Sequence, residues 1–317
     1  MKKKKVVIIG GGNGSAISLV ALKQNLDLFE ISGIISMSDS GGSSGRLRKD
    51  LGVLPPGDIM RAILALSAYD YPLLKKIFYR NRFSVSGKLN KHNLGNLFLS
   101  LGSKYCGSLL KIIRALEESV DAVGRVYPAT LKVNDLVAEL VNGKIIKTEA
   151  KIDKPDYDRN LRIKNVYLEP RVKANPDALQ EILSADYLII SPGSLYTSVI
   201  AALLPVGIKE TIGKSTVKII FVAGNAYHIY GETGPHDLSE IVTELEGYLP
   251  RKVDCVLYNN HKLNKKEQEY YKTKTWGVVK NDLDKLPDHK VVSFDFSKAD
   301  GGLCSIKLGK KIRELLK

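Results

Sequence analysis

The chain has 317 residues, of which 26% are charged and 44% hydrophobic, a balance typical of a folded globular protein and not of a disordered chain. No run approaches the roughly 20 apolar residues that span a bilayer, and the apolar run after the first lysines, residues 6–9, is too short for a secretory signal. We therefore expect a cytoplasmic protein without membrane insertion. The three cysteines lack the spacing of metal ligands, which argues against a disulfide framework or a zinc site.

The net charge is +14, and much of it lies at the two ends. Lys2 to Lys5 contribute +4, and residues 298–317, with six basic and two acidic side chains, contribute a further +4. Binding of nucleic acid by these ends is one hypothesis. We rank it last because the chain, with 7% aromatic residues, has no basic and aromatic stacking platform. An anionic small ligand explains the remaining basic excess at least as well.

The first third of the chain has the pattern of an α/β protein. Residues 5–10 (KVVIIG) form an apolar β-branched run that ends in glycines, residues 15–25 have apolar residues at helical spacing, and residues 31–37 form a second apolar run. A strand, a glycine turn, a helix and a second strand in a parallel sheet are therefore expected. Helical patterns follow at residues 58–68, 72–79, 93–103 and 108–118.

The pattern changes near Gly124, where an antiparallel insertion at about residues 124–170 is expected. Residues 135–140 and 144–152 alternate around Asn142-Gly143, a pair typical of a hairpin turn. The α/β pattern then returns, with strands predicted at residues 186–190, 217–222, 253–257 and 291–294 and helices at 174–183, 237–247 and 305–317. The sequence thus predicts one doubly wound α/β domain over residues 1–317, with a mostly parallel sheet and an inserted hairpin.

The first glycine turn has the composition of a phosphate-binding loop. It stands between the first strand and the first helix, where free backbone N–H groups and the helix dipole attract an anion. The predicted ligand-binding residues are Gly11, Gly12, Asn13 and Gly14. The turn is neither a complete dinucleotide fingerprint nor a Walker loop, so a simple tight turn is the alternative.

A long loop is expected at residues 38–48, after the second strand. Its glycines and serines offer hydrogen-bond donors, and arginine can form charge-assisted bonds to phosphate. The predicted ligand-binding residues are Gly41, Gly42, Ser43, Ser44 and Arg46. Asp39 could contact a ribose hydroxyl, a metal ion or the proton of a nucleophile. A mobile surface loop is the alternative.

Two helix starts supply further candidates. Asp58 and Arg61, one turn apart, either face the cleft or form a local pair on a capped helix. Asn93 and Asn96 share a helix face, and Gly95 between them would permit close packing or the approach of a ligand. His92 is more typical of a cap or a surface position.

Two later strands are also followed by loops whose glycine, hydroxyl or amide groups could bind a ligand. After residues 186–190 come the predicted ligand-binding residues Ser191, Gly193, Ser194, Tyr196 and Thr197, with a Ser-Pro-Gly turn as the alternative. Asn225 and Glu232 follow the strand at residues 217–222. Because the carboxyl ends of parallel strands lie along one edge, these loops predict a cleft for a nucleotide with phosphate groups. Asp39 and Glu232 could share a divalent ion.

The strings GGGNGS, DSGGSSGRLRKDLGVLPPGDI, HNLGN and SPGSLYTSVI resemble those of the gluconeogenesis-factor family (YvcK-like), in the same order and over nearly the whole chain. That family belongs with the 2-phospho-L-lactate transferases (CofD-like). The resemblance implies a Rossmann-like fold and a cytoplasmic protein that binds UDP-sugars such as UDP-N-acetylglucosamine. It also implies a role in growth on gluconeogenic carbon sources, cell shape and cell-wall precursor supply.

No enzymatic activity is established for that branch, whereas the transferases use magnesium. The resemblance therefore implies Mg²⁺ as a cofactor, and Asp39 as a catalytic residue, only if the protein is a transferase. By position it assigns residues 11–14, Asp39, residues 41–46, Asn93, Asn96 and the loop of residues 191–197 to the cleft. The predicted partner is a nucleotide or nucleotide-sugar, and the apolar, basic C-terminal helix is a candidate interface for a homo-oligomer.

The sequence departs from the family at three places. Ser40 stands where the family usually has a second Asp, which removes a potential magnesium ligand and favours a binding role over a transferase. Asn13 stands where the family usually has Thr, and it can still form hydrogen bonds to a nucleotide. The stretch from Tyr227 to Thr233 lacks the proline that usually precedes Gly231.

Overall fold

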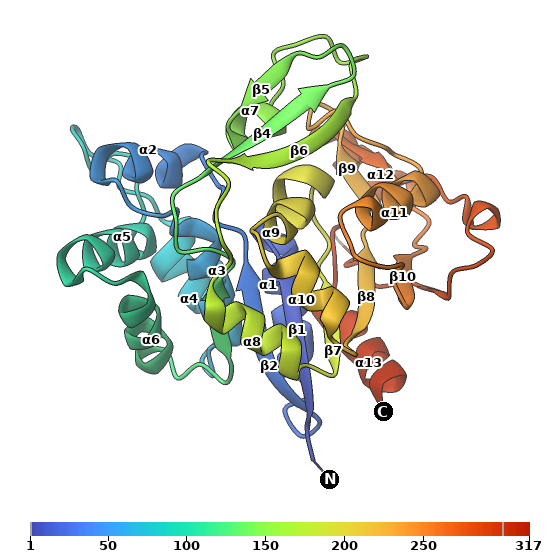
Figure 1. Cartoon of the computed structure of the whole chain (residues 1–317), viewed down its shortest axis with the longest axis horizontal. Helices are drawn as coiled ribbons and strands as arrows, with labels where there is room; N and C mark the ends of the chain where they lie inside the picture. The colour runs from blue at the N-terminus through green and yellow to red at the C-terminus, as the bar shows by residue number, and fades with distance from the viewer. Residues whose placement is uncertain (1, 300) are drawn as a thin grey trace.

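The computed structural model describes residues 2–299 and 301–317, and Figure 1 shows a central sheet flanked by helices. Within these residues seven parallel strands form the sheet in the order β12-β10-β8-β7-β1-β2-β3. The strands are β1 (Lys4–Gly10), β2 (Phe29–Ile35), β3 (Arg125–Pro128), β7 (Tyr187–Ile190), β8 (Lys218–Ala223), β10 (Cys255–Asn259) and β12 (Val291–Phe294). The predicted fold class, α/β with a mostly parallel sheet, is confirmed.

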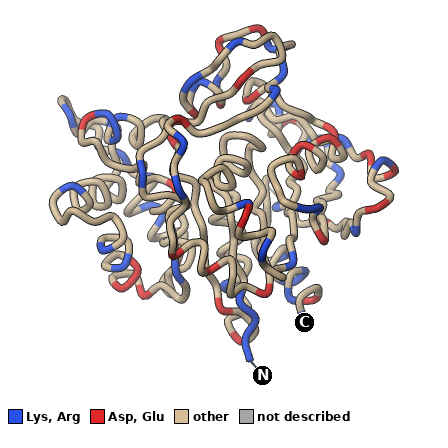
Figure 2. Tube along the Cα trace, in the orientation of Figure 1, with Lys and Arg blue, Asp and Glu red and all other residues tan. Residues whose placement is uncertain are grey.

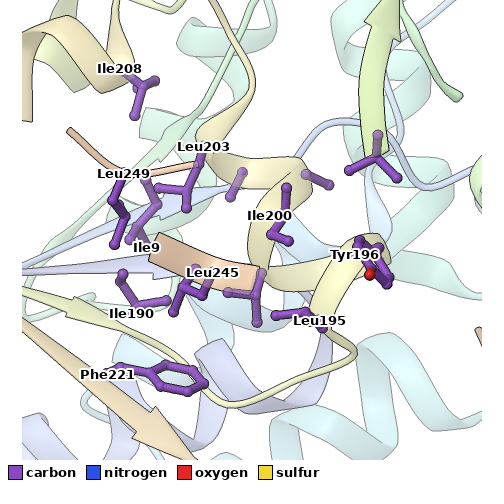
Figure 3. Packing of buried hydrophobic residues seen from close by; sticks show 14 of the residues in the cluster. Ile9, Ile190, Leu195, Tyr196, Ile200, Leu203, Ile208, Phe221, Leu245 and Leu249 are labelled. Atoms are coloured by element: carbon purple, nitrogen blue, oxygen red, sulfur yellow. The ribbon is translucent and has the colours of Figure 1, made fainter. Parts of the chain in front are cut away.

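Both faces of the sheet are buried, and the inner parts of its central strands are continuously apolar, as in β1 from Val6 to Ile9. In β1, Val7 and Ile9 point into one hydrophobic layer, and Val6 and Ile8 point into the other. All four side chains are at most 1% exposed. Figure 3 shows part of the first layer, including Ile9, Ile190, Leu203, Phe221 and Leu245.

The predicted helices are confirmed, with ends that shift by a few residues. They are α1 (Gly12–Lys23), α3 (Gly57–Leu66), α4 (Tyr71–Leu74) with the π-helical η1 (Lys75–Arg80), α5 (Leu94–Cys106), α6 (Leu109–Ser119), α8 (Pro176–Ser184), α11 (Leu238–Gly247) and α13 (Ser305–Leu316). The helix after the loop of residues 191–194 begins as the π-helical η2 (Leu195–Ile200) and continues into α9 (Ala201–Leu203). The patterns did not predict α10 (Ile208–Lys214), α12 (Lys265–Thr273) or the 3-10 turn η3 (Leu283–Lys285).

The prediction of a loop over residues 38–48 is wrong from Gly42 onward, because α2 (Gly42–Leu51) begins there. Two glycines explain why this sequence can be helical. A Cβ on Gly45 would lie 1.9 Å from the carbonyl oxygen of Ser40, so glycine lets the chain before the helix pass close to it. Gly52 ends the helix in the left-handed conformation, with φ of +67°.

A small antiparallel sheet projects from the main body, at the top of Figure 1. It consists of β4 (Asp135–Leu140), β5 (Ile145–Lys147) and β6 (Ile163–Glu169), and Gly143 turns the β4–β5 hairpin with φ of +83°. The predicted second strand, residues 144–152, is wrong in its last part, because α7 (Glu149–Asp153) follows Thr148 at a φ of +85°. A third sheet pairs β9 (Ala226–His228) with β11 (Trp276–Val278).

Basic and acidic residues are interleaved along the outer elements, and the N-terminal segment is basic (Figure 2). Across residues 2–299 and 301–317, every helix is too short or too polar to cross a membrane.

Candidate functional site

The loops after β1 and β7 meet where the strand order reverses. From β1 the chain proceeds to β2 and β3 on one side, and from β7 it proceeds to β8, β10 and β12 on the other. A Cβ on Gly14 would lie 1.5 Å from the carbonyl oxygen of Pro192, and a Cβ on Gly10, whose φ is +154°, would lie 2.1 Å from Ser191 Oγ. Glycine is required for this close contact, at the position where open α/β sheets bind ligands.

A pocket of about 600 Å³ opens at this edge of the sheet. Six predicted site residues line it: Asn13, Gly14, Gly193, Ser194, Asn225 and Glu232. Further lining comes from α4–η1, from the paired strands β9 and β11, from the loop after β9 and from the chain after β12. It includes Tyr71, Lys75, Arg80, Tyr227, His236, Trp276, Lys298, Gly301 and Gly302. The pocket therefore brings together loops that are far apart in the sequence.

Positive charge is concentrated in one wall of the pocket. Lys75, Arg80 and Lys298 line it from two segments. The pKa of the Lys75 ammonium is lowered first by burial and then by the positive charges of Arg61, Arg80 and Lys298. An anion placed among these groups would relieve their mutual repulsion. The sequence carried no local signal for them, because Lys and Arg at such positions look like ordinary surface residues.

Aromatic rings supply flat surfaces in the lining of the pocket. The rings of Tyr227 and His236 are stacked, with centroids 3.8 Å apart and an interplanar angle of 25°. Trp276 meets Tyr271 edge to face, with centroids 5.3 Å apart. Such rings can stack on a planar base.

Glu232 is anchored on the start of η2. Its carboxylate accepts hydrogen bonds from the N–H groups of Tyr196 (3.1 Å) and Thr197 (3.0 Å) and from Thr197 Oγ1 (3.1 Å). Burial raises the pKa of Glu232 to about 7. Tyr196 is 0% exposed and belongs to the core. The expectation that Tyr196 and Thr197 offer free donors to a ligand is therefore corrected: Glu232 already occupies those donors.

Asp58 joins the first loop to a second group of predicted residues. The Gly12 N–H donates to Asp58 Oδ2 at 2.8 Å, and Asp58 Oδ1 pairs with the Arg61 guanidinium at 3.2 Å. Arg61 in turn lies 4.4 Å above the ring of Tyr79. The local Asp58–Arg61 pair that the sequence allowed is present, and it also holds the glycine turn through Gly12; a Cβ on Gly11 would lie 3.1 Å from Asp58 Oδ2.

Two more carboxylates stand beside Asp58. Asp39 Oδ1 accepts a bond from the Gly41 N–H at 2.9 Å, and Glu149 Oε2, from α7, accepts a bond from the Ser40 N–H at 3.1 Å. Burial and then the charge of Asp58 raise the pKa of Asp39. Burial and then the charge of Asp39 raise the pKa of Glu149 to about 8. Glu149 was not among the predicted site residues, because the alternating pattern of residues 144–152 predicted a strand there.

Buried polar side chains connect α2 to α5 behind these carboxylates. Asn96 Nδ2 donates to Ser43 Oγ at 3.0 Å, and Ser43 Oγ lies 2.8 Å from His92 Nδ1. Asn93 caps α5 by accepting a bond from the Asn96 N–H at 2.8 Å. His92 is buried in this network, which corrects its expected place at the surface.

Only six of the predicted residues line the pocket. Asp58 links the glycine turn beside the pocket, through the Gly12 N–H, to the neighbouring carboxylates. The predicted residues outside the lining are Gly11, Gly12, Asp39, Gly41, Gly42, Ser43, Ser44, Arg46, Asp58, Arg61, Asn93, Asn96, Ser191, Tyr196 and Thr197. Arg46 is exposed and donates to the Asn90 carbonyl at 2.7 Å. Arg48 instead holds the loop from inside, with Nη1 donating to the Asp39 carbonyl at 3.1 Å and Nη2 3.0 Å from Asp135 Oδ1.

The carboxylates have the chemistry but not the arrangement of a magnesium site. Carboxylate oxygens are preferred Mg²⁺ ligands, and a Cβ on Gly41 would lie 3.5 Å from Asp39 Oδ1 and 3.9 Å from Glu149 Oε2. Among residues 2–299 and 301–317, however, no three His, Cys, Asp or Glu side chains are placed to hold a metal ion together. Glu232, which the sequence suggested could share a divalent ion with Asp39, accepts its hydrogen bonds from the start of η2.

Comparison with known proteins finds relatives of this chain in a single family. The profile of the family described as 2-phospho-L-lactate transferase CofD matches residues 6–296. A gluconeogenesis factor of Bacillus subtilis is 32% identical over 287 residues, which cover 90% of this chain and 88% of that protein. A gluconeogenesis factor of Halalkalibacterium halodurans is 38% identical over 241 residues, 76% of this chain and 72% of that protein.

A solved structure is also similar to this chain over its whole length. A member of the UPF0052 family from Bacillus halodurans matches with a TM-score of 0.90 and 32% identity, over 99% of both chains. Together with the matches in sequence, this shows that the chain belongs to the CofD family and, within it, to the gluconeogenesis factors.

Proposed function

We propose that the protein is a regulator that binds a nucleotide-sugar of the UDP-N-acetylglucosamine type in the pocket at the β1–β7 switch point. The observation that carries the proposal is that glycine turns and cationic side chains line the same pocket. Asn13, Gly14 and Gly193 line it from the loops after β1 and β7, and Lys75 and Arg80 line it from η1. Its volume of about 600 Å³ lies within the range of small-molecule and cofactor sites.

The chemistry of the walls suggests how such a ligand is held. The diphosphate would lie between the glycine turns and the cations, where charge-assisted bonds contribute most. The rings of Tyr227, His236 and Trp276 would contact the base, and the polar groups near Asn225 would face the sugar or ribose hydroxyls. Ligand binding would shift the populations of the loops around the pocket, and partner proteins would respond to that shift.

The wider role proposed follows the family. A cytoplasmic protein that senses a cell-wall precursor would connect central carbon metabolism with cell shape and wall synthesis. The proposal does not require the protein to catalyse a reaction, because a regulator needs only the binding groups that the pocket walls supply.

Calorimetry with UDP-N-acetylglucosamine tests the binding proposal. Lys75→Ala should weaken binding by roughly tenfold or more, as expected from the loss of one charge-assisted bond of about 1.5–3 kcal/mol. Lys76→Ala is the matched control, because Lys76 is the neighbouring lysine, is exposed and does not line the pocket. No heat from folded wild-type protein at millimolar ligand, or equal losses in both variants, would contradict the proposal.

The second candidate function is a magnesium-dependent transferase of phosphorus-containing groups, similar to 2-phospho-L-lactate transferase. The observation in its favour is that three carboxylates, those of Asp39, Asp58 and Glu149, are near enough for their charges to act on one another, and carboxylate oxygens are ligands that Mg²⁺ prefers, although the three are not arranged to hold one ion together. It requires magnesium-dependent product from a nucleotide-activated donor. It also requires Asp39→Asn to abolish turnover while ligand binding is retained. Full turnover in that variant would reject the catalytic role of Asp39.

A further inference from the structure

The surface formed by residues 69–106, named here the α4–α5 face, exposes an unusual number of apolar side chains. Of the 21 large apolar side chains exposed in the described part of the chain, ten lie in this segment. They are Tyr69, Leu73, Ile77, Phe83, Val85, Leu89, Leu94, Phe98, Leu101 and Tyr105. Single exposed apolar residues are ordinary, but a concentration of this kind marks an interaction surface.

Helix α5 carries the most regular part of this face. Four exposed residues repeat at spacings of four, three and four, which places them in one row along an α-helix. They are Leu94 (45% exposed), Phe98 (41%), Leu101 (40%) and Tyr105 (80%). The opposite side of α5 is the one that packs inward, with Gly95 against Met60 and Leu99 fully buried. The outer row therefore contributes nothing to the core of the domain.

A hollow of about 380 Å³ adjoins the C-terminal end of this row. Ser103 and Lys104 of α5 line one side of it, and Leu131 and Val133 line another. Both Leu131 and Val133 are themselves exposed. The row thus leads to a concave site, lined by both polar and apolar residues, of the size that accepts one large anchoring side chain.

The charge of the α4–α5 face restricts what it can bind. Residues 69–106 contain seven Lys or Arg and a single Asp, and two of the seven line the pocket. The five that do not are all exposed: Lys76, Arg82, Lys88, Lys91 and Lys104. A second copy of the chain would place one basic surface against another, and such like-charge contacts cost several kcal/mol. A bilayer surface calls for a broad apolar face, whereas the spacing on α5 produces the narrow seam of helix–helix packing. Charge and spacing together favour an acidic amphipathic helix.

We propose that the α4–α5 face is the docking surface for an amphipathic helix of a protein partner, with apolar residues at heptad spacing and acidic residues on both flanks. The apolar row of the partner packs along Leu94, Phe98 and Leu101, in the manner of a two-helix seam. Its carboxylates lie near the surrounding lysines and arginines. This inference does not depend on the proposed ligand of the pocket, and the test uses the full chain without added nucleotide.

The probe is a fluorescent synthetic peptide of about three heptads with Leu at positions a and d and Glu at positions e and g, compared with a peptide that has Lys at e and g. Fluorescence anisotropy should show that the Glu peptide binds and that added salt weakens it. Leu101→Asp should weaken binding by at least about tenfold. Leu183→Asp is the matched control, because Leu183 is a leucine on helix α8 that is 47% exposed and lies outside the face.

Lys104→Glu provides a second variant that leaves the apolar row intact, and it should weaken the Glu peptide while strengthening the Lys peptide. Circular dichroism confirms that each variant is folded. Failure of the Glu peptide to bind, equal affinity for the Leu101→Asp and wild-type proteins, or no preference for Glu over Lys would overturn the proposal. Binding to vesicles containing phosphatidylglycerol without peptide binding would overturn it in favour of a membrane surface. A dimer in sedimentation that Leu101→Asp abolishes, without peptide binding, would overturn it in favour of self-association.

Discussion

Asp58 Oδ2 accepts a hydrogen bond from the Gly12 N–H at 2.8 Å, and this bond connects the glycine turn after β1 to the start of α3. Its other oxygen holds Arg61 at 3.2 Å. Because one side chain satisfies both a backbone donor and a partly buried guanidinium, its removal leaves two groups without their partner. The first prediction follows from this double role.

Asp58→Ala should lower the free energy of unfolding by about 1–3 kcal/mol, measured by urea denaturation. Asp58→Asn, which can still accept the Gly12 bond, should cost less. The control is Glu269→Ala, which removes an ion pair with Lys272 whose side chains are 70% and 74% exposed, and should change stability by less than about 0.5 kcal/mol. Equal effects of Asp58→Ala and Glu269→Ala would show that Asp58 does not brace the turn.

The second prediction concerns pH and Glu149. In the folded protein this carboxyl keeps its proton up to about pH 8, whereas in the unfolded chain it releases the proton near pH ~4.3. Between these values the folded state binds more protons, so the contribution of Glu149 to stability falls as pH rises. Glu149→Gln should remove this fall. The melting temperature of the variant minus that of the wild type should therefore be at least about 2 °C larger at pH ~8 than at pH ~5.

The exposed Glu118, exchanged for Gln, serves as the control and should leave the pH dependence of the wild-type protein unchanged. A difference between the wild-type and Glu149→Gln midpoints that stays constant across this pH range would count against a raised pKa for Glu149.

The third prediction tests Glu232 as the anchor of η2. Glu232→Ala removes the acceptor for the N–H groups of Tyr196 and Thr197 and for Thr197 Oγ1. The variant should lose about 1–3 kcal/mol of stability, and hydrogen exchange of the Tyr196 and Thr197 amides should accelerate. Unchanged exchange at both amides would mean that Glu232 does not hold the start of η2.

The fourth prediction concerns the contact between the first two loops. A Cβ on Gly14 would lie 1.5 Å from the Pro192 carbonyl oxygen, a distance that no side-chain rotation can relieve. Gly14→Ala should therefore destabilise the protein by more than about 3 kcal/mol or prevent its accumulation in folded form. Gly247→Ala, at a helical position with no atom within 4 Å of the added Cβ, should leave stability unchanged or raise it by up to about 1 kcal/mol. Similar melting temperatures for the two variants would disprove the tight contact.

Much of the fold follows from patterns between neighbouring residues. The run KVVIIG is apolar after its first lysine and forms most of the central strand β1, and Asn142-Gly143 turns the β4–β5 hairpin. The family strings, such as DSGGSSGRLR, identify the chain without any tertiary information. The same string shows a limit, because its glycines and serines indicate a loop, whereas residues 42–51 are helical once Gly45 packs against Ser40.

The composition of the site was decided by the tertiary structure. Glu149 reaches the Ser40 amide across 109 residues of sequence, and Lys298 enters the pocket beside Lys75 only because the chain after β12 returns to that edge of the sheet. Glu232 occupies donors on η2 that the sequence suggested were free. Periodicity and turn chemistry depend on residues within a few positions of each other, whereas these contacts depend on the order in which the strands pair. That order is set by the burial of both faces of the sheet as a whole, which no local stretch of the chain encodes.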